Sequence, residues 1–259
     1  MVLLVVLCAV VGLVVGSFLN VVIHRVPRGE SVVRPRSHCP ACGAGVRPRD
    51  EIPVLSWLLL AGRCRDCRAR ISARYPAVEL LTAGVFVILA LRLGASTVLP
   101  AYLYLGAACV ALALIDLDTK RLPNAIVLPS YPVGLVLLLA ASATGESFSP
   151  LWRGLIGLVA MYAFYFALRV FYPQGMGFGD VKLAGVLGLY TGFLGWDVWF
   201  VGLFAGFLFG GVVSVGLVFA GRAGRKSKVP FGPFMVLGAL LAIVAGQPLA
   251  SAYLDVTLG

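Results

Sequence analysis

Charge is scarce in this chain of 259 residues: only 12% of them are Asp, Glu, Lys or Arg, whereas 60% are apolar. A soluble domain carries about a quarter charged residues, so this balance excludes an ordinary soluble enzyme. Histidine is scarcer still, because His24 and His38 are the only two in the chain. This excludes a histidine-based relay in the apolar regions. The sequence also lacks a Gly-rich loop of the Walker or dinucleotide type, so we expect no nucleotide site.

The apolar residues gather in runs long enough to cross a membrane. A bilayer core of about 30 Å needs about 20 apolar residues in a helix. We therefore predict an all-α polytopic membrane protein with about eight transmembrane helices, of which the sixth is the shortest. The predicted spans are 1–23, 77–93, 98–117, 125–141, 151–171, 181–195, 198–220 and 231–253. The first run has no basic residue ahead of it, so we interpret it as a retained helix and not as a signal peptide.

The chain has a formal net charge of +10, and in the predicted topology nearly all of its basic residues fall on one side of the membrane. Residues 24–75 hold eleven arginines against four acidic residues, a balance of 11 − 4 = +7. Further basic residues mark every second later connection: Lys120, Arg121, Arg169, Lys182, Arg222, Arg225, Lys226 and Lys228. The positive-inside rule then predicts both termini outside and residues 24–76 in the cytoplasm. We interpret the surplus as topology and contact with anionic membrane lipids, not as a nucleic-acid-binding surface.

The chain divides into a first helix, residues 1–23, a cytoplasmic insertion, residues 24–76, and a seven-helix membrane body, residues 77–259. No internal repeat is apparent. Within the insertion, Ile52 to Leu60 is apolar but too short to span, so we expect it to form a small core or to lie against the membrane. Glycines inside the spans favour close helix packing, and we assign this role to Gly206, Gly210, Gly211 and Gly216.

Four cysteines of the insertion form two CxxC pairs, Cys39 with Cys42 and Cys64 with Cys67, with 21 residues between the pairs. Each pair can present two thiolates to one tetrahedral ion, which indicates a structural zinc site with a complete shell. Two disulfides are the alternative, but a cytoplasmic loop is kept reduced. The metal would supply folding energy that so small an insertion lacks.

Two aspartates, Asp116 and Asp180, stand at the ends of predicted spans. A carboxylate within a membrane costs on the order of 3 kcal/mol and by default indicates a functional site. The alternative is that each acid sits at the interface, paired with Lys120 or Lys182. The predicted topology places the inner ends of the third and sixth spans on one side of the membrane, so both aspartates can face one site.

Such a pair suits hydrolysis of a peptide bond. Two neighbouring carboxylates tend to share one proton, so one can activate a water while the other protonates the departing amine. The glycines that precede Asp180 would let an extended substrate approach the backbone closely, or let this segment move on binding. The sequence does not say which aspartate holds the proton.

Several motifs in order resemble the type IV prepilin peptidases, a family of bacterial membrane aspartic peptidases. The matching segments are GSFLNVVIHRVP at 16–27, the two CxxC pairs, IPVLSW at 52–57, RYPAVE at 74–79, IDLD to LPN within 115–124 and GFGDVK at 177–182. One departure is Asn124, where many members have Asp. By this resemblance the catalytic residues are Asp116 and Asp180, and Asp118, which a helix turns about 200° away from Asp116, is only a neighbour.

The resemblance further implies cleavage of the basic leader from type IV prepilins or type II secretion pseudopilins, at the cytoplasmic face of the bacterial inner membrane. It also implies methylation of the new amino terminus with S-adenosylmethionine, whose site the sequence does not identify. Glu79 and Asn20 are candidates for positioning substrate or cofactor, or else for packing helices. Two other functions stay open: a GxGD peptidase without methylation, and a non-enzymatic zinc-dependent assembly factor or proton-coupled carrier.

Overall fold

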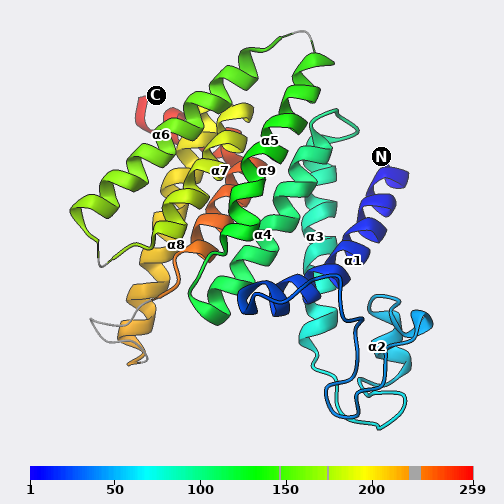
Figure 1. Ribbon diagram of the computed structural model, residues 1–259. Helices are drawn as coiled ribbons and strands as arrows, with labels where there is room; N and C mark the ends of the chain where they lie inside the picture. Colours follow the sequence, from blue (N-terminus) through cyan, green and yellow to red (C-terminus); the bar gives the residue numbers. More distant parts are fainter. Residues whose placement is uncertain (146, 174, 222–228, 259) are drawn as a thin grey trace. The chain divides into compact units, whose positions relative to one another are not determined.

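A computed structural model describes residues 1–145, 147–173, 175–221 and 229–258, and its regular structure is helical throughout this part of the chain (Figure 1). The α-helices are α1 (Val2–Arg25), α2 (Leu55–Leu59), α3 (Arg74–Leu93), α4 (Leu99–Thr119), α5 (Asn124–Ala143), α6 (Ser149–Phe171), α7 (Phe178–Leu194), α8 (Trp196–Phe219) and α9 (Gly232–Leu258). The all-α prediction is confirmed. Four of the basic residues that indicated topology lie outside the described residues: Arg222, Arg225, Lys226 and Lys228.

Seven of the described helices, all but α2 and α7, are long and apolar enough to cross a membrane. The protein is therefore a multi-pass membrane protein, but the predicted count of eight spans is not confirmed. The exception among the predicted spans is the sixth, which corresponds to α7. This helix has 17 residues, so it is about 26 Å long, against about 30 Å for the bilayer core.

The helices cluster in two compact units, residues 1–99 and residues 100–259. The first unit consists of α1, the insertion and α3. Small residues bring its two long helices into backbone contact: a Cβ atom added at Gly16 would lie 2.6 Å from the Cα atom of Glu79. Because nothing larger than glycine fits there, the end of α1 and the start of α3 are tightly apposed.

The second unit is built around α7, whose residues from Leu183 to Phe193 are all buried. Figure 1 shows α7 beside α6, and the two helices touch through glycine: a Cβ atom at Gly157 would lie 2.6 Å from the carbonyl oxygen of Gly188. At the far end of α7, Arg153 donates to the carbonyl oxygens of Gly192 and Phe193, at 2.8 and 2.6 Å. These bonds satisfy carbonyls that a helix end leaves without partners.

Only some of the glycines that were predicted to pack helices together lie against another helix. Gly206 packs against α9, and a Cβ atom at Gly238 would lie 2.5 Å from the backbone nitrogen of Gly206. Gly210 packs against the ring of Phe231. The prediction was wrong for Gly211 and Gly216, because a Cβ atom at either would have no described neighbour within 4 Å. They lie on a face of α8 that the described part of the chain does not cover.

Candidate active site and metal centre

The four cysteines of the insertion form a group that could hold a metal ion. The Sγ atoms of Cys39, Cys42, Cys64 and Cys67 all lie within 4.8 Å of one another, and those of Cys39 and Cys67 are 3.7 Å apart. A tetrahedral zinc site with Zn–S bonds of about 2.3 Å has S–S edges of about 3.8 Å. The four thiols are free and not paired in disulfides, so the sulfur positions fit a tetrahedral ion.

The backbone around the two cysteine pairs follows one pattern twice. In the first pair, the N–H of Cys39 donates to the carbonyl oxygen of Ala44, and its own carbonyl oxygen accepts from Gly43. Cys64 makes the same two bonds with Ala69 and Arg68. We call these segments, residues 38–45 and 63–70, the first and second knuckle. They form a short local repeat that the sequence analysis did not recognise, since the residues other than cysteine differ.

Backbone amides also favour the ionised form of a cysteine ligand. The N–H groups of Cys42 and Ala41 bond to the sulfur of Cys39 and lower the pKa of its thiol to about 7. A thiolate is the form that binds a metal. In the first knuckle Cys39 is the cysteine favoured in that form, whereas the neighbouring cysteine side chains, Cys67 foremost, raise the pKa of the Cys42 thiol.

Ion pairs connect the second knuckle to the chain before it. The Arg65 guanidinium donates to both carboxylate oxygens of Asp50, with a shortest distance of 2.6 Å, and holds the pKa of that carboxyl below its ordinary value. Arg47 pairs with Asp66 at 2.9 Å. These bonds, together with four thiol ligands, would hold together an insertion whose own apolar core is small.

A buried carboxylate joins the insertion to α3. Glu79 is only 7% exposed, and its Oε2 accepts a hydrogen bond of 2.7 Å from the N–H of Val54. Val54 has φ +61°, a conformation that a β-branched residue rarely adopts. Asn20 donates to the carbonyl oxygen of Tyr75, at 3.1 Å, where α3 begins. Both residues thus hold backbone at the junction of α1, the insertion and α3.

Asp116 lies in the last turn of α4 and is 4% exposed. Its Oδ2 accepts a hydrogen bond of 3.1 Å from the backbone N–H of Gly232, the first residue of α9. Asp118, two residues further on, is exposed, as expected for a helix position turned away from Asp116. The sequence analysis missed Gly232. The only signal for it is the Pro-Phe-Gly-Pro segment, residues 230–233, with which the last predicted span begins.

Asp180 occupies the first turn of α7 and is 8% exposed. Its Oδ2 accepts from the N–H of Gly177 at 3.0 Å, and its own N–H donates to the carbonyl oxygen of Gly177 at 3.2 Å. This reciprocal pair fixes the carboxylate at the helix start, where the partial positive charge of the helix end favours an acid.

The structure brings the two aspartates into one neighbourhood. Leu122 packs against the glycine next to each aspartate. A Cβ atom at Gly179, which precedes Asp180, would be 2.9 Å from the Cβ atom of Leu122, and a Cβ atom at Gly232, which bonds to Asp116, would be 3.3 Å from its Cδ2 atom. The glycine before Asp180 therefore makes room for a side chain of the protein itself, which the sequence analysis did not foresee.

Lys182, one of the two lysines that could have neutralised the aspartates, bonds elsewhere. Lys182 donates to Oδ1 of Asn124 at 3.0 Å and lies over the ring of Phe178, 4.8 Å from its centre. Arg169 donates to the carbonyl oxygen of Met176 at 2.7 Å, just ahead of the GxGD motif. The salt bridges of Arg47 with Asp66 and of Arg65 with Asp50 lie in the insertion. The alternative in which Asp180 is paired with Lys182 is therefore not supported.

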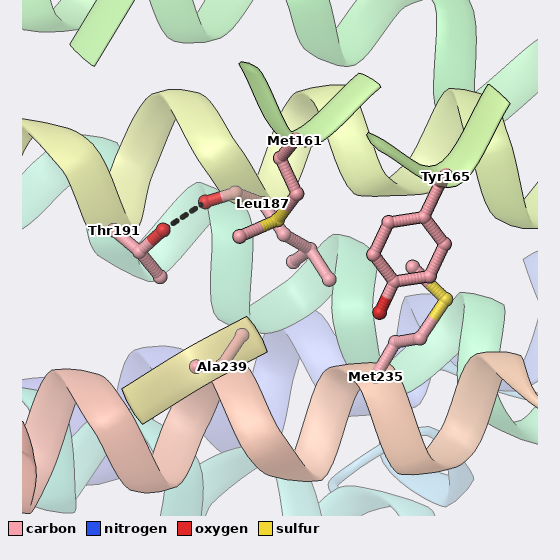
Figure 2. A pocket seen from close by; sticks show the side chains of 7 residues that line it. Met161, Tyr165, Leu187, Thr191, Met235 and Ala239 are labelled. Carbon is pink, nitrogen blue, oxygen red and sulfur yellow. Dashed lines mark hydrogen bonds between the residues drawn. The ribbon is translucent and has the colours of Figure 1, made fainter. Parts of the chain in front are cut away.

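A small cavity of about 10 Å³ lies between α6, α7, α8 and α9. Figure 2 shows Met161, Tyr165 and Met235 pointing into it, beside a Thr191 hydroxyl that donates to the carbonyl oxygen of Leu187 at 2.8 Å. The space is that of about one water molecule. The cavity is too small for a peptide, and its size indicates that the helices around α7 pack closely.

Comparisons with known proteins agree with the motifs. The bacterial peptidase A24 N-terminal domain matches residues 10–93, and the type IV leader peptidase family matches residues 103–215. A prepilin leader peptidase/N-methyltransferase of Aeromonas salmonicida strain A449 is 35% identical, over 95% of this chain and 92% of the relative. The protein of the same name from Bacillus subtilis strain 168 is 33% identical, over 96% and 97%.

A third relative, the type 4 prepilin-like proteins leader peptide-processing enzyme of Escherichia coli O78:H11, is 38% identical over 92% of this chain and 93% of its own. No solved structure matches the chain significantly. Relatives at this identity, aligned along nearly the full length of both chains, establish that the chain belongs to the type IV leader peptidase family.

Proposed function

We propose that this protein cleaves the leader peptide from type IV prepilins or pseudopilins, with Asp116 and Asp180 as its catalytic pair. The observation that carries the proposal is that two buried carboxylates each have one oxygen bonded to a glycine N–H, in two segments that both pack against Leu122. A carboxylate can accept about four hydrogen bonds, so both retain capacity for a water or a substrate. The names of the relatives support a prepilin as substrate.

The chemistry needs one proton shared between the two acids. The ionised aspartate removes a proton from a water, whose oxygen attacks the scissile carbonyl carbon to give a tetrahedral intermediate. The protonated aspartate then gives its proton to the departing nitrogen, and the C–N bond breaks. The hydrogen bonds from Gly177 and Gly232 hold the carboxylates in position throughout, which is where the protein contributes most to such a step.

The test is cleavage of a co-expressed prepilin by variants of the pair. Asp116→Asn and Asp180→Asn should each abolish processing while the protein remains in the membrane, because an amide can neither remove nor donate the proton. Asp118→Asn is the matched control and should process normally. Processing by either amide variant would refute the assignment.

We further propose that the enzyme methylates the new amino terminus, because the relatives carry N-methyltransferase in their names. S-adenosylmethionine would supply the methyl group to the neutral amine of the mature pilin. The S–CH3 bond would break, S-adenosylhomocysteine would leave, and the methylated amine would lose a proton. We assign no residue to this donor. The mass of the mature product distinguishes this activity from a peptidase alone, because methylation adds one methyl group.

For the four-cysteine group we propose a structural zinc ion, with Cys39, Cys42, Cys64 and Cys67 as ligands. The support is the sulfur spacing and the shape of the two knuckles. The complete thiolate shell leaves no position for a substrate, so the ion would stabilise the insertion and take no part in hydrolysis.

We also propose residence in the bacterial inner membrane, with the insertion and the aspartates facing the cytoplasm and both termini outside. This topology requires the short helix α7 to cross the membrane as an eighth span. The support is the alternation of basic connections. Reporter fusions at residue 259 and within residues 24–76 should report opposite sides of the membrane. A non-enzymatic assembly factor or proton-coupled carrier would instead leave prepilin processing unaffected when its gene is deleted.

A further inference from the structure

A cleft of about 580 Å³ opens beside the second knuckle, and nothing described so far uses it. Its wall includes Trp57, Gly62, Arg63, Arg70 and Ser72, and it ends at Ala73. Sites for small ligands span about 300–1,000 Å³. The cleft therefore has room for a ligand of that size, within the insertion and away from Asp116 and Asp180 in the sequence.

Arg63 and Arg70 face each other across the knuckle as an antiparallel pair. The bonds that frame them run from the N–H of Cys64 to Ala69 and from the N–H of Ile71 to Gly62. The arginines thus form the non-hydrogen-bonded type of pair, in which the side chains are closest. Like charges directly opposite each other destabilise such a pair.

Neither of these two arginines has an acidic partner in the described part of the chain, whereas Arg47 and Arg65 pair with Asp66 and Asp50. Two of the four acids of the insertion, Asp50 and Asp66, are thus used elsewhere. Two apposed guanidinium groups at the wall of a cleft are an arrangement that an anion would stabilise, and their planar shape suits the paired oxygens of a phosphate.

The surroundings of the cleft resemble a membrane interface. Ala73 is the residue before α3, a helix of membrane-spanning length. The short helix α2 carries Trp57 and presents Leu55, Leu58 and Leu59 outward, with exposed fractions of 58, 58 and 84%. The ring of Trp57 is fixed by a bond from Nε1 to the carbonyl oxygen of Ile71, at 3.2 Å. Tryptophan is enriched where headgroups meet the hydrocarbon.

We propose that the Arg63–Arg70 cleft binds the phosphate of an anionic phospholipid headgroup. The paired guanidinium groups would hold the phosphate, and the exposed leucines of α2 would lie against the acyl chains. The continuity of a cationic cleft with an apolar helix face favours a lipid over a soluble phosphate, since a soluble ion would not use the leucines. The proposal does not depend on the peptidase or methyltransferase activity.

The experiment uses the full-length, zinc-loaded protein in nanodiscs that contain equal amounts of phosphatidylglycerol and phosphatidylcholine. Native mass spectrometry after release into detergent measures which lipid each variant retains. One arginine near an anionic surface contributes about fivefold to binding. The double variant Arg63→Gln/Arg70→Gln should therefore retain phosphatidylglycerol on the order of twentyfold less than the unmodified protein. Arg36→Gln, an exposed arginine outside the cleft, should match the unmodified protein.

Equal retention by the double variant and the unmodified protein would overturn the proposal. Displacement of the lipid by glycerol 3-phosphate would also overturn it, because the cleft would then be a site for a soluble phosphate. The zinc content and prepilin cleavage of the double variant serve as its folding controls.

A second measurement needs no change at the arginines, should the double variant fail to fold. Phosphatidylglycerol with brominated acyl chains quenches tryptophan near the hydrocarbon. The quenching of the unmodified protein minus the quenching of the Trp57→Phe variant is the quenching of Trp57 alone. This difference should be larger with brominated phosphatidylglycerol than with brominated phosphatidylcholine. No quenching of Trp57, or equal quenching by the two lipids, would refute a bound anionic lipid at the cleft.

Discussion

The backbone N–H of Gly232 donates a hydrogen bond of 3.1 Å to Oδ2 of Asp116, and the bond is buried. It connects the start of α9 to the end of α4 across 116 residues of sequence. The close approach requires glycine, because a Cβ atom at position 232 would lie 2.7 Å from the same oxygen. The position of the carboxylate therefore depends on a residue far outside its own motif.

Gly232→Ala should impair cleavage without unfolding the protein. The added methyl group must push the Asp116 carboxylate aside, and a misplacement of about 1 Å can cost on the order of a hundredfold in rate. We expect kcat for a synthetic prepilin to fall by about tenfold to a hundredfold. Gly211→Ala is the control, since a Cβ atom there has no described neighbour within 4 Å. Unchanged kcat for Gly232→Ala would show that Asp116 tolerates displacement.

Cys39→Ser combined with Cys64→Ser should release the metal and loosen the insertion. One thiolate is then lost from each knuckle, and the ion that supplies folding energy no longer has a complete shell. Elemental analysis should find zinc in the unmodified protein and little in the variant, whose residues 24–76 should become sensitive to protease. The double variant Cys8→Ser/Cys109→Ser, changed only within helices α1 and α4, should keep its zinc. Absence of zinc from the unmodified protein would refute the metal assignment.

Glu79→Ala should loosen the attachment of the insertion to α3. Its carboxylate is the acceptor for the N–H of Val54, and loss of a bond to a charged acceptor costs about 1.5–3 kcal/mol. We expect hydrogen exchange of residues 52–60 to accelerate by about tenfold or more, while α3 remains protected. Glu51→Ala, an exposed acid in the same segment, should exchange at the normal rate. Normal protection in Glu79→Ala would show that this bond does not hold the insertion.

Gly157→Val should lower the thermal stability of the membrane body. Its branched side chain would meet the carbonyl oxygen of Gly188, because even a Cβ atom would lie only 2.6 Å away. Forcing α6 from α7 should cost about 1–3 kcal/mol, the range for overpacked cores. Thermal unfolding in detergent measures the loss. Gly216→Val, on a face of α8 without described neighbours, should be much milder, and equal melting temperatures for the two would contradict the packing interpretation.

The sequence predicted local features well. The two CxxC pairs, which begin at Cys39 and Cys64, predict a metal site because two thiols on one tight turn lie close together. Asp116 stood out as a costly carboxylate at the end of an apolar run, and its burial agrees with that interpretation. Whether Asp116 and Asp180 catalyse remains a prediction, as do the domain boundaries and the orientation in the membrane.

Apolar composition alone did not distinguish contact with lipid from contact with protein at two points. Gly206 and Gly211 are equivalent in the sequence, yet only Gly206 packs against a described helix. Likewise α7 and its neighbours have similar hydropathy, yet α7 is enclosed by protein. An apolar residue is equally satisfied by lipid and by another helix, so hydropathy cannot tell the two surroundings apart.

The sequence by itself determined that this is a helical membrane protein with a four-cysteine insertion and two motif aspartates, because hydropathy, ligand spacing and motif order are properties of neighbouring residues. Only the tertiary structure decided that Gly232 bonds to Asp116 and that α7 is the buried centre of its unit. It also decided that Arg63 and Arg70 lack, within the described part of the chain, the acidic partners that Arg47 and Arg65 have. Each of these depends on segments distant along the chain meeting in space, and such meetings are set by the packing of whole helices.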